Sequence, residues 1–460
     1  MFFCIFPVLP NLQFGRPKYQ HLQCANESFS CRGRTSPTVQ VERRSAVAPW
    51  QSIINRGAFY RLLLQQLFDL EIICIFAPKT TMEKMLNSIL INNYKNIRHL
   101  LIPKLGRVNL VWGKNNVGKS TMLEALSIYA SNGRMDQLYE ILKMRGEDLN
   151  VFGYRDSFTT EEEMNAFLPL VSDYKKSILE TDGVQVGESE ENVVTIKLVR
   201  VSRVRTNLSE SGKTSTIRIV APVEAPQEEN IVSQSLGIQM ANHSKQLDYV
   251  INLNGHGFKD FSLLDSVGMP INVPFNYISS NGNQGTSIDK LWASVSMSEN
   301  EDYVIKALQI IEPRIKRFNI LTSDSTGSEQ GFIPFVLLEG ENSRVRLSSM
   351  GDGINRILTI ILSLINCKGG IFLLDEFENG LHYSVQSKLW DIIFELAKNL
   401  DVQVFVTTHS NDCINSFAHL SMSEDGLAIR LDMGANGLKA QLYEDPEKLV
   451  FAMNESIELR

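Results

Sequence analysis

The sequence has few cysteines and no long uninterrupted apolar run. Its six cysteines include neither a Cys-x-x-Cys pair nor the dense spacing of a disulfide framework, which indicates a reducing compartment. The longest apolar stretch, residues 59–77, is interrupted by Arg61, Asp69 and Glu71, and charges at such positions make a membrane-spanning helix too costly. Residues 1–10 lack the basic segment and cleavage site of a secretory signal. We therefore expect a cytoplasmic protein without a membrane partner.

The chain also lacks a heptad repeat and a general excess of positive charge. The missing heptads exclude a long coiled coil. Lys and Arg number 45 against 52 Asp and Glu, giving a net charge of −7, which argues against a surface that coats nucleic acid without specificity. The length of 460 residues is that of a protein with several domains.

The first 81 residues differ from the rest of the chain. They contain nine Lys or Arg against four Asp or Glu, and they show no sustained strand or helix periodicity before residue 59. We expect residues 1–81 to be a disordered or non-native extension, with the native start at Met82 or Met85. A small basic recognition arm remains the alternative.

A phosphate-binding loop is the strongest motif in the chain. Residues 113–121 read Gly-Lys-Asn-Asn-Val-Gly-Lys-Ser-Thr between a strand-like run at 107–112 and a helix-like run at 120–130. Glycines permit the backbone N–H groups to approach phosphate oxygens, and the helix N-terminus favours an anion. The lysine would reach the terminal phosphates, and the serine hydroxyl would coordinate Mg²⁺. The predicted nucleotide-binding residues of this loop are Gly113, Asn115, Asn116, Gly118, Lys119, Ser120 and Thr121.

Two later strands end in residues that suit phosphate chemistry. The apolar run 371–374 leads into Asp375 and Glu376, which is typical of a central parallel strand presenting acids at its carboxyl end. Asp375 would support Mg²⁺ through water, and Glu376 would activate the attacking water. The strand 402–408 leads into His409, whose imidazole could contact the γ-phosphate. A strand running into a solvated acidic turn is the structural alternative.

A Ser/Gly loop precedes the acidic strand. Residues 347–353 read Leu-Ser-Ser-Met-Gly-Asp-Gly and lead into an amphipathic helix that ends before Gly369. Such a loop at a helix N-terminus can bind a second anion, through Ser348 or Ser349 with Gly351 and Gly353. A plain helix cap with flexible glycines is the alternative.

The order of these patterns predicts an α/β phosphate-binding-loop NTPase. We expect residues 82–150 to form the first part of the ATPase head, 151–285 an inserted lobe rich in antiparallel strands, and 286–460 the second part of the head. Strands are predicted at 86–92, 97–102, 193–201, 215–221, 247–253, 315–321, 332–338 and 427–431. Exposed loops are predicted at 180–192 and 221–230, and a helix at 289–311.

Together, these motifs resemble the ATP-binding-cassette superfamily. More narrowly, Gly-Lys-Asn-Asn-Val-Gly-Lys-Ser, Met-Gly-Asp-Gly-Ile-Asn-Arg and Leu-Asp-Glu-Phe-Glu-Asn-Gly-Leu-His resemble prokaryotic AAA-type proteins related to the overcoming-lysogenization-defect and RecF-like ATPases. The resemblance implies a mixed-sheet head in which a homodimer sandwiches two ATP molecules with Mg²⁺. It also implies that Lys119, Glu376 and His409 are catalytic, that Ser120 and Asp375 serve the metal, and that Ser349, Gly351 and Gly353 face the partner's nucleotide.

We therefore predict an ATP-hydrolysing molecular switch that controls an effector protein in DNA maintenance or phage defence. One alternative is an ATP-dependent DNA clamp in which Arg200, Arg203 and Arg205 contact phosphates. A transporter ATPase is a further alternative, which the β-rich insert and the altered Ser/Gly motif disfavour.

Overall fold

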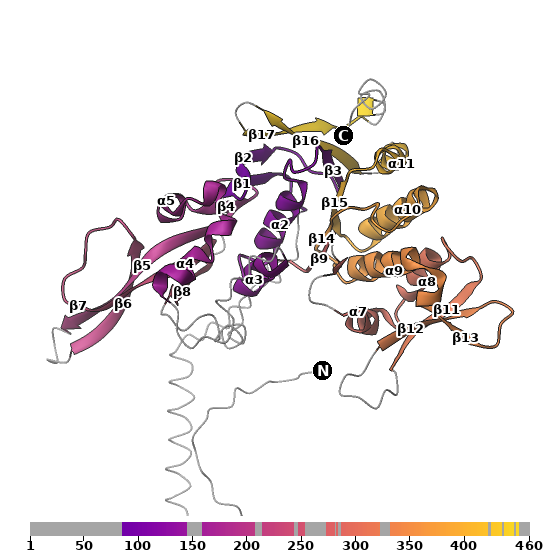
Figure 1. The fold of residues 1–460 in the computed structure, drawn as a ribbon, viewed down its shortest axis with the longest axis horizontal. Helices are drawn as coiled ribbons and strands as arrows, with labels where there is room; N and C mark the ends of the chain where they lie inside the picture. Colours follow the sequence, from indigo (N-terminus) through magenta and orange to yellow (C-terminus); the bar gives the residue numbers. More distant parts are fainter. Residues whose placement is uncertain are drawn as a thin grey trace, which may run out of the picture. The chain divides into compact units, whose positions relative to one another are not determined.

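A mostly parallel sheet forms the centre of the larger part of this computed structural model (Figure 1). The structure describes residues 85–144, 159–207, 214–242, 247–253, 273–280, 282–283, 287–322, 332–421, 425–434, 437–445 and 448–449. The central sheet has the order β10 (Gly282–Asn283), β9 (Phe275–Ser279), β14 (Ile371–Leu374), β15 (Gln403–Thr408), β3 (Val108–Gly113), β16 (Gly426–Gly434) and β17 (Gly437–Tyr443). The predicted extension at residues 1–81 lies outside the described residues.

The inner strands of this sheet are parallel, and their side chains are buried. β9, β14, β15, β3 and β16 pair in parallel, whereas β10 and β17 are antiparallel edge strands. Every residue of β3, β14 and β15 is buried, as expected for strands covered on both faces. Parallel pairing places the carboxyl ends of β3, β9, β14 and β15 along one edge.

A second, antiparallel sheet begins with the first hairpin. It contains β2 (Ile97–Ile102), β1 (Ile89–Tyr94), β4 (Val184–Gly187), β5 (Val193–Asn207), β7 (Ile231–Asn242) and β8 (Leu247–Leu253), and β6 (Thr214–Pro222) pairs with β5. The predicted hairpin is present, with Ile91 opposite Leu100. The prediction of a loop over 180–192 was wrong in part, because β4 lies within it. This strand pairs with both β1 and β5, which local composition does not reveal.

Helix α2 (Lys119–Ala130) packs between the two sheets. Helix α3 (Met135–Met144) follows it, and α4 (Thr160–Asn165) and α5 (Lys176–Glu180) lie further along the chain. The other face of the central sheet is covered by α9 (Asp352–Ile365), α10 (Tyr383–Asn399) and α11 (Asn411–Ser421) (Figure 1). The face of α9 that was predicted to be apolar is buried, and its side chains belong to the same hydrophobic core as those of the central sheet.

The predicted helix over 289–311 is two helices. α7 (Ile288–Val295) and α8 (Glu301–Leu308) are separated by a turn in which Met297 has a φ of 64°. The strands predicted at 315–321 and 332–338 do not return to the central sheet. They form a separate antiparallel sheet of β11 (Ile315–Thr322), β12 (Phe332–Leu338) and β13 (Arg344–Arg346).

Strand pairing crosses both proposed domain boundaries. β4, β5 and β7, from the proposed lobe at 151–285, extend the sheet that β1 and β2 begin. β9, from the same range, pairs with β14 in the central sheet. The division of the chain at residues 151 and 286 therefore remains a proposal. Each of the two large sheets contains strands from both sides of a proposed boundary.

Two cysteines of the described part of the chain, Cys367 and Cys413, are free and buried. Burial raises the pKa of the Cys367 thiol to about 12, and burial also raises the pKa of Cys413. Both thiols are therefore protonated and poorly reactive in the folded protein. Over the described ranges, no helix has the length and hydrophobicity that a transmembrane span needs.

Candidate active site

The candidate site lies where the parallel strands of the central sheet end. The phosphate-binding loop follows β3, Asp375 and Glu376 follow β14, and His409 follows β15. The register aligns these ends, because Thr408 pairs with Trp112 and Leu374 pairs with Val406. Segments that are hundreds of residues apart in sequence therefore meet at one edge, which is the usual ligand position in such sheets.

The loop has the backbone geometry that its glycines were predicted to permit. Gly113 has a φ of 150°, Gly118 a φ of 118° and Asn116 a φ of 60°. A Cβ on Gly113 would lie 2.3 Å from the Leu431 carbonyl oxygen, so a larger residue would displace the neighbouring strand. Helix α2 then begins at Lys119, without a side-chain cap at its N-terminus. Its first N–H groups can therefore donate hydrogen bonds to a bound anion.

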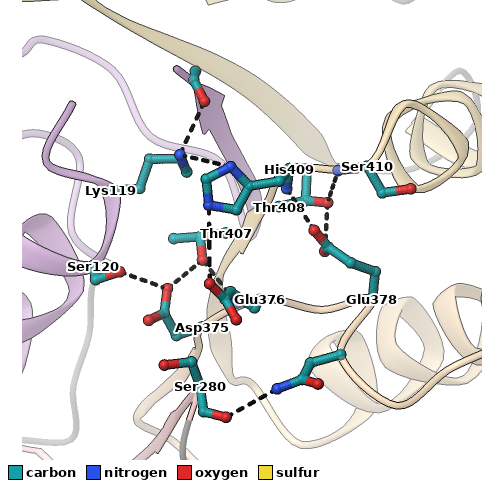
Figure 2. A network of polar contacts seen from close by, with 12 residues as sticks. Lys119, Ser120, Ser280, Asp375, Glu376, Glu378, Thr407, Thr408, His409 and Ser410 are labelled. Carbon is teal, nitrogen blue, oxygen red and sulfur yellow. Dashed lines mark hydrogen bonds and ion pairs between the residues drawn. The ribbon is translucent and has the colours of Figure 1, made fainter. Parts of the chain in front are cut away.

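Lys119 lies buried beneath the loop. Its Nζ donates to the carbonyl oxygens of Gly113 and Lys114 at 2.9 and 3.0 Å. The same Nζ lies 3.3 Å from Nδ1 of His409 (Figure 2). Burial lowers the pKa of Lys119 to about 8, against the opposing effect of nearby carboxylates, of which Asp375 is the largest. The nearby carboxylates offset only part of the cost of burying the charged ammonium. A bound polyanion would compensate further for its lost hydration.

Ser120 and Asp375 connect the two halves of the site. The Ser120 hydroxyl donates to Oδ1 of Asp375 at 3.1 Å (Figure 2), and Asp375 is 3% exposed. Thr407 Oγ1 donates to the same carboxylate oxygen and accepts from the Glu376 backbone N–H. The hydroxyl and carboxylate oxygens provide the hard ligands that Mg²⁺ prefers.

A metal at this position would depend on ligands from outside the protein. Among the described residues, no group of three or more His, Cys, Asp or Glu side chains could hold a metal ion. Mg²⁺ typically binds one or two protein oxygens and completes its octahedron with phosphate oxygens and water. Ser120 and Asp375 fit that arrangement.

Glu376 and His409 face each other across the site. Oε1 of Glu376 lies 3.9 Å from Nε2 of His409 (Figure 2). Both side chains are about one-third exposed, so water can reach them. Glu376 has a φ of 52°, an unfavourable backbone region for a long side chain, and such outliers concentrate at functional sites.

Glu378 has a different environment from Glu376. Its two carboxylate oxygens accept hydrogen bonds from the His409 backbone N–H at 2.6 Å and from Thr408 Oγ1 at 2.7 Å (Figure 2). This carboxylate therefore secures the turn that carries His409. Of the two glutamates, Glu376 is the one placed to contact a water molecule.

Three positioning residues were not predicted from the sequence. Arg356 on α9 donates to the carbonyl oxygens of Asp375 and Glu376 at 3.1 and 3.4 Å. Phe377 stacks on Trp390 of α10, with ring centroids 4.4 Å apart. Thr407 connects β15 to both acids. Arg356 and Thr407 lie within motifs that the sequence displays, but their hydrogen-bond partners depend on the fold.

A cavity of about 880 Å³ lies over the phosphate-binding loop. Among its lining residues are Asn115, Asn116, Gly118, Lys119, Ser120, Thr121, Glu376 and His409. The structure thus brings most of the predicted site residues together around one space. Among the described residues that line it, none comes from 349–353: Ser349 is exposed and donates to the Arg346 carbonyl oxygen, and Gly351 has open space where a Cβ would project.

The fold and this site define a phosphate-binding-loop NTPase. Residues 85–197 and 276–414 match the family model described as "AAA ATPase domain", and these ranges cover more than half of the chain. The protein belongs to this family and is an ATPase, which confirms the AAA-type resemblance seen in the motifs.

Two relatives illustrate the match. The chain is 25% identical over 366 residues to an "ATP/GTP phosphatase" of Helicobacter pylori (strain ATCC 700392 / 26695), covering 74% of this chain and 90% of the relative. It is 40% identical over 67 residues to an uncharacterized protein of Methanocaldococcus jannaschii, covering 14% of this chain and 31% of the relative.

Solved heads of SMC proteins also align with the chain at low similarity. An Smc head bound to the C-winged helix domain of ScpA has a TM-score of 0.40 at 13% identity, covering 81% of this chain and all of that one. The SMC head domain from Thermotoga maritima has a TM-score of 0.34 at 12% identity, covering 78% of this chain and all of that one.

Proposed function

We propose that this ATPase is a molecular switch that binds ATP with Mg²⁺, hydrolyses it and changes its association state with the nucleotide. The observation that carries the proposal is the 3.1 Å contact between Ser120 and Asp375, because it joins the phosphate-binding loop to the paired acids. Lys119, Glu376 and His409 surround the same cavity. Phosphoryl transfer depends mainly on such positioning and on charge neutralisation.

Each side chain has one task in this proposal. Lys119 holds the terminal phosphates, and backbone N–H groups between Gly113 and Thr121 bind their oxygens. Glu376 orients a water molecule for attack and accepts its proton. His409 contacts the γ-phosphate and is positioned by Glu378 through its backbone. Mg²⁺, held by Ser120 and supported by Asp375, would neutralise charge on the phosphates.

We further propose that the active form is a homodimer with ATP at the interface. The Ser/Gly loop at 348–353 leads into the long helix α9, which begins at Asp352, and the N-terminus of such a helix suits an anion. Ser349 is exposed, and this loop lies outside the cavity of its own chain. A second subunit could therefore receive this loop over its nucleotide, so that Ser349, Gly351 and Gly353 complete the partner's site.

The dimer is tested by light scattering with the Glu376→Gln variant. With ATP and Mg²⁺, we expect this variant to double in mass, because the bound ATP that holds the interface is not hydrolysed. The protein without nucleotide, and Lys119→Ala with ATP, should stay monomeric. A Glu376→Gln variant that binds ATP and keeps the monomer mass would contradict the dimer while leaving the ATPase assignment intact.

The controlled partner is proposed to be an effector protein in DNA maintenance or phage defence, in the cytoplasm, where thiols such as Cys367 remain reduced.

The alternative function is a DNA clamp, and one of the three arginines proposed to contact DNA phosphates is not available for that contact. Arg200 is 8% exposed, and its guanidinium donates to the carbonyl oxygens of Val223, Ala225 and Pro226. Arg203 and Arg205 remain exposed, and salt-dependent DNA binding that requires ATP would favour the clamp.

A further inference from the structure

The cavity continues beyond the phosphate-binding loop to a wall that the proposed chemistry does not use. This wall is formed by Lys95 and Asn96 in the turn of the β1–β2 hairpin and by residues of the segment 169–174. Its members from that segment are Pro169, Val171, Asp173 and Tyr174. A nucleoside triphosphate whose phosphates occupy the loop must place its sugar and base against some part of the remaining lining.

Tyr174 is the aromatic residue of this wall. Tyr174 is 67% exposed, whereas tyrosine is usually intermediate in burial. It also has a φ of 56°, and Asp173 before it has a φ of 59°. Left-handed backbone is unfavourable for a bulky residue, and two successive residues of this kind are maintained only where the surroundings determine them.

The segment that carries Tyr174 is fixed to the hairpin by several contacts. The buried Ser172 hydroxyl donates to the Ile97 carbonyl oxygen at 3.1 Å, and the Lys95 N–H donates to the Leu170 carbonyl oxygen at 3.1 Å. Val171 forms an isolated bridge with Tyr94. The exposed ring therefore belongs to a firmly attached segment, and its backbone position is set by a buried framework.

The same hairpin also contacts the phosphate-binding loop. The Asn96 side-chain amide donates to the Asn116 carbonyl oxygen at 3.4 Å, and it lies beside Gly118. The hairpin turn therefore connects the backbone that carries Tyr174 to the phosphate-binding loop. An aromatic side chain that lines the same cavity as a phosphate site is what recognition of a nucleobase requires.

We propose that Tyr174 is the base-stacking platform of this site and that it accepts adenine and guanine alike. The inference rests on the proposed nucleotide-binding function. Every base presents a π-face, so stacking tolerates a change of base. Asp173, the acidic neighbour, is paired with Arg98 at 3.1 Å and with Lys175 at 3.6 Å, so these two cations compete with guanine for its carboxylate.

Calorimetry with ATP, GTP and inorganic tripolyphosphate tests this proposal on the full chain. Tyr174→Ala should weaken ATP and GTP binding by about 5- to 100-fold, the range for loss of one stacked base. Tripolyphosphate has no base, so its affinity should not change in the same variant. Tyr174→Phe keeps the ring and should bind all three ligands like the original protein. Tyr383→Ala, which removes an exposed tyrosine outside the cavity, is the matched control.

The possible outcomes distinguish a failure of the Tyr174 platform from a failure of the proposed nucleotide binding. Unchanged ATP affinity in Tyr174→Ala would overturn the platform, and so would an equal loss of tripolyphosphate binding, because that loss reflects damage to the whole site. A preference of the original protein for ATP over GTP of more than about tenfold would overturn the tolerance for both bases. If the original protein bound neither nucleotides nor tripolyphosphate, the proposed function itself would fail, and this inference with it.

Discussion

The Glu376→Gln variant is expected to hydrolyse ATP roughly a hundredfold more slowly or worse, while still binding ATP. General-base catalysis contributes about 10²- to 10⁴-fold to a rate. Glutamine preserves the size of the side chain but cannot accept the proton of the attacking water. The backbone N–H of residue 376 would keep its hydrogen bond to Thr407, and Arg356 would still hold the two neighbouring carbonyl oxygens. Geometry and nucleotide binding should therefore be retained.

Phosphate release and ATP affinity, measured on the same preparation, check this prediction. Glu378→Gln is the matched control, since it makes the same chemical change two residues away. Glutamine retains an oxygen that can accept from the His409 N–H, so we expect this control to keep at least about a tenth of the turnover. A severe loss in Glu378→Gln with near-normal turnover in Glu376→Gln would show that the base has been assigned to the wrong glutamate.

The Lys119→Ala variant is expected to lose ATP binding by roughly 30-fold or more. Truncating one partner of a buried, hydrogen-bonded charge pair costs about 2–5 kcal/mol, and each 1.4 kcal/mol corresponds to a tenfold change in affinity. Removal of Lys119 also deprives the Gly113 and Lys114 carbonyl oxygens of their donor, which loosens the loop. Turnover at low ATP concentration should fall in the same proportion or further.

Binding of a fluorescent ATP analogue measures the effect, and Lys114→Ala provides the control within the loop. Lys114 is exposed, and the Lys119 ammonium contacts its backbone oxygen, so truncating its side chain preserves that contact. We expect at most a severalfold change, because exposed charges contribute little. Equal affinities of Lys119→Ala and the original protein would remove the phosphate-binding role from this lysine.

The elements of the site that could be predicted from the sequence are those with local causes. Gly113 and Gly118 have positive φ angles that other residues avoid, so the glycines themselves indicate the local backbone conformation. The run at 371–374 is apolar throughout because β14 is buried on both faces. Asp375, Glu376 and His409 follow such strands directly, so shared parallel orientation was enough to predict that they meet.

The remainder depended on pairings that no local pattern specifies. β4 is short, and its place between β1 and β5 is decided by distant partners. The pairing of β11 with β12 and β13 likewise follows from tertiary contacts. Tyr174 lies in a segment without clear periodicity, and its exposure beside the cavity results from the hairpin contacts of Ser172 and Lys95.

A structure of the Glu376→Gln variant determined with ATP and Mg²⁺ would show whether the phosphate-binding loop and the acids after β14 bind one nucleotide. We expect one triphosphate that contacts Lys119 Nζ, with a cation held by the Ser120 hydroxyl near the Asp375 carboxylate. The γ-phosphate should lie beside His409 and residue 376. A triphosphate bound to the glycine loop but remote from the acids after β14, or bound elsewhere altogether, would contradict it.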